Sequence, residues 1–173
     1  MLIMSHKSWS YLPVKQWWMR PFSFVSKTQE VDIRTQYLRY NVKVFDLYVR
    51  FDKKNKLVLS NGSFEYKYDA DDLFNDLSWI DSRTDCYVQV VHDEKGHIQQ
   101  FKDFCNLLED NFTHTKFFGG YSGENEEYIF SYSPQIKSNF FISKGMAKIH
   151  NELLKMTYKD SKIILPLAFV NYG

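Results

Sequence analysis

Residues 42–51, VKVFDLYVRF, constrain the fold more than any other stretch, because they predict a long strand whose two faces differ in character. Side chains alternate between the two faces of a strand. One face is apolar nearly end to end, which is typical of a sheet covered by helices. It consists of Lys43, Phe45, Leu47, Val49 and Phe51. The opposite face begins apolar and turns polar, in the order Val42, Val44, Asp46, Tyr48 and Arg50. In an α/β barrel this gradient indicates a packed lumen that opens into a site at the carboxyl end of the strand.

Strand-like runs and helical spacing alternate along much of the chain. The predicted strands are Leu2–Ser5, Val42–Phe51, Leu57–Leu59, Cys86–His92, Thr115–Tyr121, Tyr128–Tyr132, Asn139–Ser143 and Ile163–Val170. The predicted helices are Gln29–Tyr40, Asp71–Ile80, Ile98–Leu108 and Met146–Met156. This order indicates an α/β fold with parallel strands. The loops between Phe117 and Ser143 leave no room for full helices, so we expect residues 1–173 to form a single domain, a compact, distorted or incomplete TIM-type (β/α) barrel.

Two further strands repeat the gradient from apolar to polar along one face. The first is Cys86, Val88, Val90 and His92, and the second is Ile163, Leu165, Leu167, Phe169 and Asn171. If these faces line the lumen, His92 ends the next barrel strand on the luminal side.

Composition excludes several classes of function. The 22 basic and 21 acidic residues nearly cancel, so we expect no nucleic-acid partner; a single-stranded nucleic acid binder that stacks bases on aromatic side chains is a remote alternative. The two cysteines form neither a disulfide framework nor a zinc motif. No signal peptide or membrane-spanning run is visible, which favours a soluble, cytoplasmic or otherwise intracellular protein. The oligomeric state stays open.

Three segments together resemble a known family. LIMSHKSW near the start, SKTQEVDIRTQYLRYNVKVFDLYVRF, and LVLSNG resemble the X-domain of phosphatidylinositol-specific phospholipase C, particularly the small bacterial type. The resemblance covers residues 2–62. It implies a phosphodiesterase that works inside a distorted barrel. His6 matches the first of the family's two histidines, Asp46 the aspartate of the second strand, and Gln36 the glutamine before that strand.

The chemistry that the resemblance implies uses one histidine as general base on the inositol 2-hydroxyl and another as general acid on the leaving glycerol oxygen. The negative charge on the phosphoryl oxygens is neutralised either by calcium held by carboxylates or, in metal-free members, by an arginine. The expected cofactor is therefore none, or a divalent cation such as calcium. The expected substrate is a phosphodiester or phospholipid headgroup.

This chain departs from the family at three of those positions. Asn61 stands where the second histidine is expected, and an amide cannot transfer a proton at neutral pH. Tyr48 replaces the arginine or second acidic ligand, and Lys7 replaces the aspartate or asparagine after the first histidine. Two residues could repair the site: Arg50 as the missing positive charge, and His92 as the missing acid. His92, Asp93 or Glu94 could also hold a metal.

These departures leave two functions open. The first is a phosphodiesterase with His6, Asp46, Arg50, Asn61 and His92 as candidate catalytic residues. The second is a catalytically degenerate barrel that serves as a binding or assembly module. Trp17 and Trp18 fall in the connection after the first strand, where phospholipases of this type can contact lipid; alternatively these rings fill gaps around the barrel.

Overall fold

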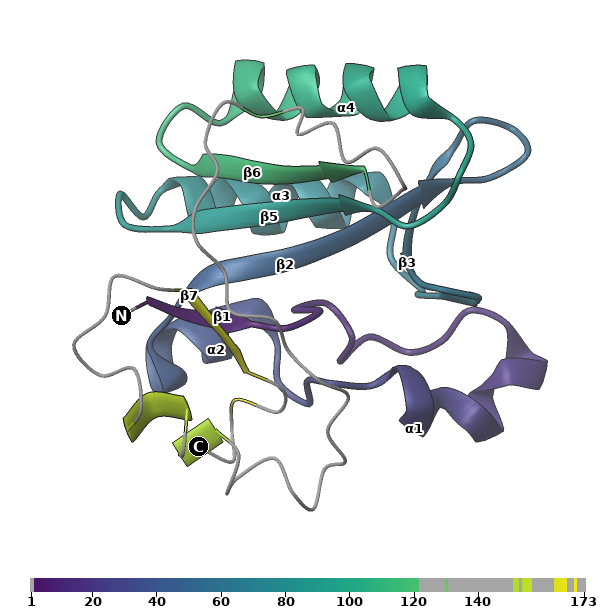
Figure 1. The fold of residues 1–173 in the computed structure, drawn as a ribbon. Helices are drawn as coiled ribbons and strands as arrows, with labels where there is room; N and C mark the ends of the chain where they lie inside the picture. The colour runs from purple at the N-terminus through teal and green to yellow at the C-terminus, as the bar shows by residue number, and fades with distance from the viewer. Residues whose placement is uncertain are drawn as a thin grey trace.

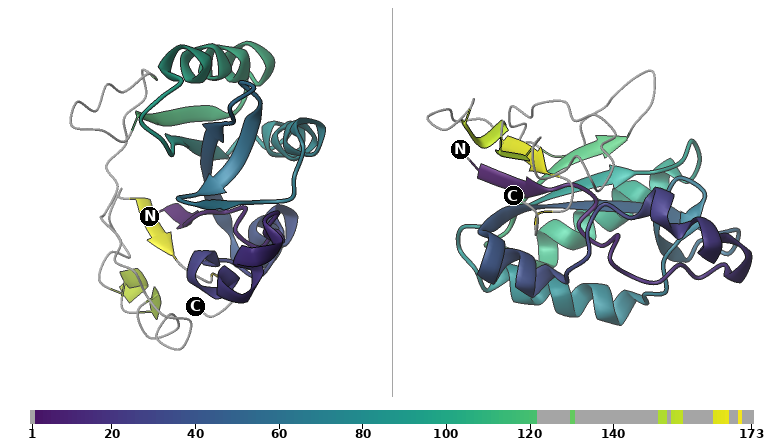
Figure 2. Two further views of the ribbon diagram at one scale, coloured as in Figure 1. Left: turned by 90° about the vertical axis from the view of Figure 1, so that its right-hand side faces the viewer. Right: turned by 90° about the horizontal axis from the view of Figure 1, so that it is seen from below.

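The computed structural model describes a curved sheet with helices along its outside (Figures 1 and 2). The described residues are 2–121, 130, 151–152, 154–156, 164–167 and 170. The strands are β1 (Leu2–Ser5), β2 (Val42–Phe51), β3 (Leu57–Asn61), β4 (Phe64–Glu65), β5 (Tyr87–His92), β6 (Lys116–Tyr121) and β7 (Ile164–Leu167). The helices are η1 (Trp17–Phe22), α1 (Ser23–Ser26), α2 (Ile33–Tyr40), α3 (Ala70–Asp81) and α4 (Ile98–Asn111).

Strand β2 is the centre of the sheet, as its ten-residue length suggests. It pairs in parallel with β1 on one side and with β5 on the other, and β5 pairs in parallel with β6. Its last residues pair antiparallel with β3, which continues into β4. The predicted α/β class with parallel strands is confirmed, and the short antiparallel hairpin is added at the carboxyl end of β2.

The last described strand returns to the first. Strand β7 pairs in parallel with β1, from Leu2 opposite Ile164 to Ser5 opposite Leu167. The order is therefore β7-β1-β2-β5-β6, which is the neighbour order of a (β/α) barrel. Among the described strands no ladder joins β6 to β7, so the sheet is an incomplete barrel, as expected from the chain length.

Two apolar layers flank β2. Phe45, Leu47 and Val49 pack in the larger layer, together with the buried faces of α3 and α4. The smaller layer lies on the inner face and consists of Met4, Val44, Phe118 and Ile164. The prediction that one face of β2 is covered by helices while Val44 and Asp46 face inward is confirmed.

Caps explain where two of the helices begin. The Asp32 carboxylate accepts a hydrogen bond from the Thr35 backbone N–H, and Asp69 accepts one from Asp72 in the same way. Helix α2 therefore begins at Ile33, later than the predicted Gln29. It ends at Tyr40, and the following residue, Asn41, has a left-handed φ of 54°.

The predicted inner faces of two strands are wrong. Val88 and Val90 of β5 pack in the helix-covered layer, and His92 stacks on Phe101 of α4 with ring centroids 4.5 Å apart. Leu167 of β7 also lies in that layer, whereas Ile164 faces inward. An apolar strand face packs equally well into a barrel lumen or against helices, so the apolar positions alone could not show which layer they join.

Some predicted elements lie outside the described residues. These are the strands Tyr128–Tyr132 and Asn139–Ser143, apart from Phe130, which is buried. Of the predicted helix Met146–Met156, residues 151–152 and 154–156 are helical.

Gly119 in β6 is a position where the fold requires glycine. Its φ is +104°, and a Cβ atom there would lie 2.4 Å from the Val90 carbonyl oxygen. We expect Gly119→Ala to lower the free energy of unfolding by about 1–3 kcal/mol, because it adds backbone strain and an overlap with backbone atoms. Urea denaturation measures the change. Gly96→Ala is the matched control, since a Cβ atom at Gly96 meets nothing within 4 Å.

Candidate functional site

The turn after β1 places two functional side chains. Lys7 has a left-handed φ of 49°, so the chain reverses directly after His6. The turn is fixed to β2 through Ser8: its backbone N–H donates to the Asp46 carbonyl at 2.9 Å, and its Oγ accepts from the Asp46 N–H at 2.7 Å. Because β1 and β2 are parallel neighbours, this contact brings His6 to the inner face of β2.

His6 and Asp46 form a hydrogen-bonded pair. Nδ1 of His6 lies 3.0 Å from Oδ2 of Asp46. An ionised carboxylate only accepts, so Nδ1 is the donor of this bond, and in the neutral imidazole Nε2 then carries the lone pair. The Asp46 side chain is 1% exposed and that of His6 is 25% exposed. A buried carboxylate thus orients a histidine whose other nitrogen can act as a base.

Lys7 adds a positive charge beside this pair. Its backbone N–H donates to the same Oδ2 of Asp46 at 3.0 Å, and its Nζ donates to Oδ1 of Asn61 at 2.5 Å. Burial lowers the pKa of Lys7, while the charges of Asp46 and Asp93 oppose that shift. Lys7 therefore links the histidine turn to the end of β3.

Both polar atoms of the Asn61 side-chain amide are hydrogen-bonded. Oδ1 accepts from Lys7, and Nδ2 donates to the Ser26 carbonyl at 2.8 Å. The structure thus brings His6, Asp46 and Asn61 into one group through Lys7. The sequence predicted these three residues but treated Lys7 only as a departure from the family.

Tyr48 completes the group as a neutral phenol. Its ring meets the His6 ring edge to face, with centroids 6.3 Å apart, and Nζ of Lys7 lies 5.3 Å from its centroid. The charge of Asp46, followed by burial, raises the pKa of Tyr48 far above its ordinary value. Tyr48 therefore carries no charge at neutral pH.

The guanidinium of Arg50, predicted to supply positive charge at the site, is bound by the β3–β4 hairpin next to Asn61. It donates to the Gly62 carbonyl at 2.8 Å and to Oε1 of Glu65 at 2.8 Å. The β3–β4 hairpin beside the end of β2 provides both acceptors. The sequence gives no indication that this hairpin reaches Arg50.

His92 lies away from the His6–Asp46 pair, because its ring points into the helix-covered layer. Its Nε2 is 3.4 Å from Oε1 of Glu94, which also contacts Nδ1 of His97 at 3.0 Å. Asp93 turns the other way, and its Oδ2 accepts from Oγ of Ser60 and from the N–H of Gly62.

A calcium site built on these carboxylates does not fit the described residues. The carboxylates of residues 92–94 point in different directions, because Asp93 accepts from Ser60 while Glu94 lies beside His92 and His97. Within the described ranges no three His, Cys, Asp or Glu side chains converge. The prediction of a metal at residues 92–94 is not supported by their geometry.

Two buried glutamines hold the turn in place. Nε2 of Gln29 donates to the carbonyls of His6 at 3.0 Å and Leu167 at 2.9 Å, and its Oε1 accepts from the Val170 N–H at 3.1 Å. Nε2 of Gln36 donates to the Ser8 carbonyl at 2.9 Å. Gln36, predicted from the resemblance, thus supports the site without lining it.

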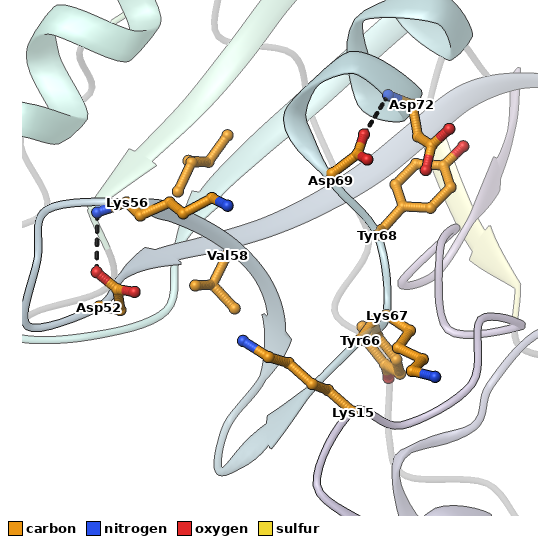
Figure 3. Close-up of a pocket in the computed structure, with 10 residues that line it drawn as sticks. Lys15, Asp52, Lys56, Val58, Tyr66, Lys67, Tyr68, Asp69 and Asp72 are labelled. Carbon is orange, nitrogen blue, oxygen red and sulfur yellow. Dashed lines mark hydrogen bonds between the residues drawn. The ribbon is translucent and has the colours of Figure 1, made fainter.

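Cavities lie at the site and outside it. A cavity of about 10 Å³, enough for about one water, is lined by Lys7, Trp9, Ser10, Asp46, Tyr48, Leu59, Ser60 and Tyr66. A larger one of about 450 Å³ lies between the β2–β3 hairpin and the segment before α3 (Figure 3). It is lined by Lys15, Asp52, Lys56, Leu57, Val58, Tyr66, Lys67, Tyr68, Asp69 and Asp72. None of the predicted site residues lines the larger cavity.

Solved structures share this architecture. The phosphatidylinositol-specific phospholipase C of Listeria monocytogenes superposes with a TM-score of 0.66 at 10% identity, over 97% of this chain and 87% of that one. The fold is that of phosphatidylinositol-specific phospholipase C. The Staphylococcus aureus enzyme superposes with a TM-score of 0.60 at 14% identity, over 96% and 72% of the two chains. A variant of it containing pentafluoro-phenylalanine gives 0.61 at 15% identity, over 95% and 70%.

The likeness lies in the fold and not in overall sequence. No family model and no curated protein matches the chain. Helices long and apolar enough to cross a bilayer do not occur in the part of the chain that the structure describes.

Proposed function

We propose that this protein is a phosphodiesterase of the phospholipase C type, acting on phosphatidylinositol or a related phosphodiester that carries a neighbouring hydroxyl. One observation carries the proposal: the His6–Asp46 pair lies where β1 ends beside its parallel neighbour β2 in this fold. That end of a (β/α) barrel is where such folds carry out chemistry.

The proposed step uses His6 as general base. Nε2 removes the proton from the headgroup hydroxyl, the resulting oxygen attacks phosphorus, and the bond to the leaving oxygen breaks to give a cyclic phosphodiester. The imidazolium that forms is stabilised by Asp46 at 3.0 Å. Because Asn61 cannot donate a proton, we expect the leaving oxygen to take its proton from water.

The proposal is tested by incubating the protein with phosphatidylinositol vesicles and following water-soluble inositol phosphates by phosphorus NMR. Parallel reactions contain calcium or a chelator, and a second series contains glycerophosphodiesters. Release of a cyclic inositol phosphate supports the proposal. If no substrate turns over in either condition, the protein is not this phosphodiesterase.

A second candidate is a binding module that uses the same site without turnover. The amide of Asn61, held by Lys7 and the Ser26 carbonyl, favours it, because no proton donor stands where the family's second histidine is expected. Saturable binding of inositol phosphates without product would support this candidate.

Peripheral contact with a lipid surface through η1 and α1 is part of the proposal. Trp17 and Phe24 are each 72% exposed, and Trp18, Phe22 and Val25 are also exposed. This segment lies toward the carboxyl ends of β1 and β2 (Figure 1), and Ser26 at its end contacts Asn61. Exposed aromatic rings next to a site at the barrel mouth suit an enzyme that works at an interface.

We expect the double variant Trp17→Ala, Trp18→Ala to bind phosphatidylinositol vesicles at least tenfold more weakly, because burying one large apolar side chain contributes about 1.5–3 kcal/mol. Vesicle sedimentation measures the partition. Leu38→Ala is the control, since Leu38 is 70% exposed on α2. Equal binding by the double variant and the control would exclude this contact surface.

A further inference from the structure

The site around His6 needs a positive charge that neither predicted position supplies. A phosphodiester is an anion, and its oxygens gain charge while the bonds at phosphorus form and break. Tyr48 is neutral, and the guanidinium of Arg50 is engaged by Glu65 and the Gly62 carbonyl.

We propose that the ammonium group of Lys7 binds the phosphoryl oxygens of the ligand, so that the site's cation comes from the turn after β1 instead of from β2. This inference rests on the proposed function. The ligand class is a phosphate ester of a polyol, in either the diester or the monoester form.

The position of Lys7 supports this role. Lys7 follows His6 directly, and the His6 ring and the Lys7 backbone are bound to the same Oδ2 atom of Asp46, each at 3.0 Å. The Lys7 side chain then passes Tyr48 and ends at Asn61. Its ammonium group therefore lies between the two positions where the resemblance places an arginine and a second histidine.

The partners of Lys7 leave it available for an anion. The described acceptor of its ammonium is the neutral amide of Asn61, and an ammonium has three N–H bonds. The nearby carboxylates have donors of their own: Asp46 accepts from His6 and from the Lys7 backbone, and Asp93 accepts from Ser60 and Gly62. No carboxylate among the described residues forms a direct ion pair with the Lys7 ammonium, so an incoming phosphate does not have to displace one of them.

Partial burial strengthens the interaction. The Lys7 side chain lines the small cavity together with Asp46 and Tyr48, and burial lowers its pKa. A charge that is partly removed from water attracts an anion more strongly than the same charge at the surface, because the effective dielectric constant is lower.

The test compares Lys7→Met, Lys7→Arg and the control Lys67→Met, with inositol 1-phosphate as the probe in isothermal titration calorimetry. Lys67 is an exposed lysine that lines the other cavity. We expect Lys7→Met to bind at least tenfold more weakly than the parent, Lys7→Arg to stay within about threefold, and Lys67→Met to match the parent. Thermal unfolding checks that each variant is folded.

The outcomes separate this inference from the proposed function. If the parent does not bind the probe, or if folded Lys7→Met binds it as tightly as the parent, Lys7 is not the phosphate-binding cation. If binding depends on Lys7 but no phosphodiester is cleaved, the inference holds and the phosphodiesterase proposal fails. If Lys7→Met cleaves phosphatidylinositol with unchanged kcat/KM, the inference fails and the proposed function stands.

Discussion

His6→Ala is expected to lower turnover of phosphatidylinositol by about 10²–10⁴-fold, the range that a general base contributes. His6 is the histidine whose Nδ1 is oriented by a buried carboxylate and whose ring is partly exposed at the barrel mouth. The rate of cyclic inositol phosphate formation at saturating substrate measures the effect. Binding of inositol 1-phosphate should change much less than turnover, because the phosphate is assigned to Lys7.

The control for this substitution is His114→Ala. His114 is also hydrogen-bonded to an aspartate, with Nδ1 3.3 Å from Oδ2 of Asp81, but it lies at the surface near α3. It should keep full activity. A His6→Ala protein that is folded and fully active would remove the basis for the proposed mechanism.

Gln29→Leu is expected to lower the free energy of unfolding by about 2–4 kcal/mol. The Gln29 side chain is fully buried and bonds to backbone groups of His6, Leu167 and Val170. An apolar side chain of similar size would leave the buried Val170 N–H without this acceptor, and an unsatisfied buried group costs about 1–3 kcal/mol. Urea denaturation followed by circular dichroism measures the change.

Gln99→Leu makes the same replacement at an exposed position on α4, where the amide bonds only to Asp103 among the described residues. Its effect should be within about 0.5 kcal/mol. If Gln29→Leu is equally mild, then its three hydrogen bonds do not fasten the carboxyl-terminal strand to the turn that carries His6.

The strand order and the helices could be predicted because their signals are local. One of the two alternating faces of residues 42–51 is almost entirely apolar, and α3 and α4 place their apolar residues on one side of the helix. The inner face of β5 could not be predicted, because the apolar positions Val88 and Val90 suit a barrel lumen as well as the layer beneath α4 in which they lie. His92 was therefore placed on the wrong face.

The site could be predicted only in part, because some of its contacts depend on which elements meet in space. His6 and Asp46 could be predicted because His6 follows the end of β1 and Asp46 lies on the inner face of its parallel neighbour β2. The partner of Arg50 could not be predicted, because Glu65 reaches it only through the β3–β4 hairpin. The role of Lys7 depends on a left-handed turn at a non-glycine residue, which the sequence does not indicate.

Asn61 lies between the aromatic segment and the charged group. The Ser26 carbonyl at the end of α1 accepts from Asn61, and Asn61 accepts from Lys7. Two hydrogen bonds therefore connect α1, which we propose to contact lipid, to the Lys7 ammonium beside His6. Asn61 would then transmit a movement of α1 to Lys7. The affinity of the site for phosphate would differ between the free protein and the protein bound to a lipid surface.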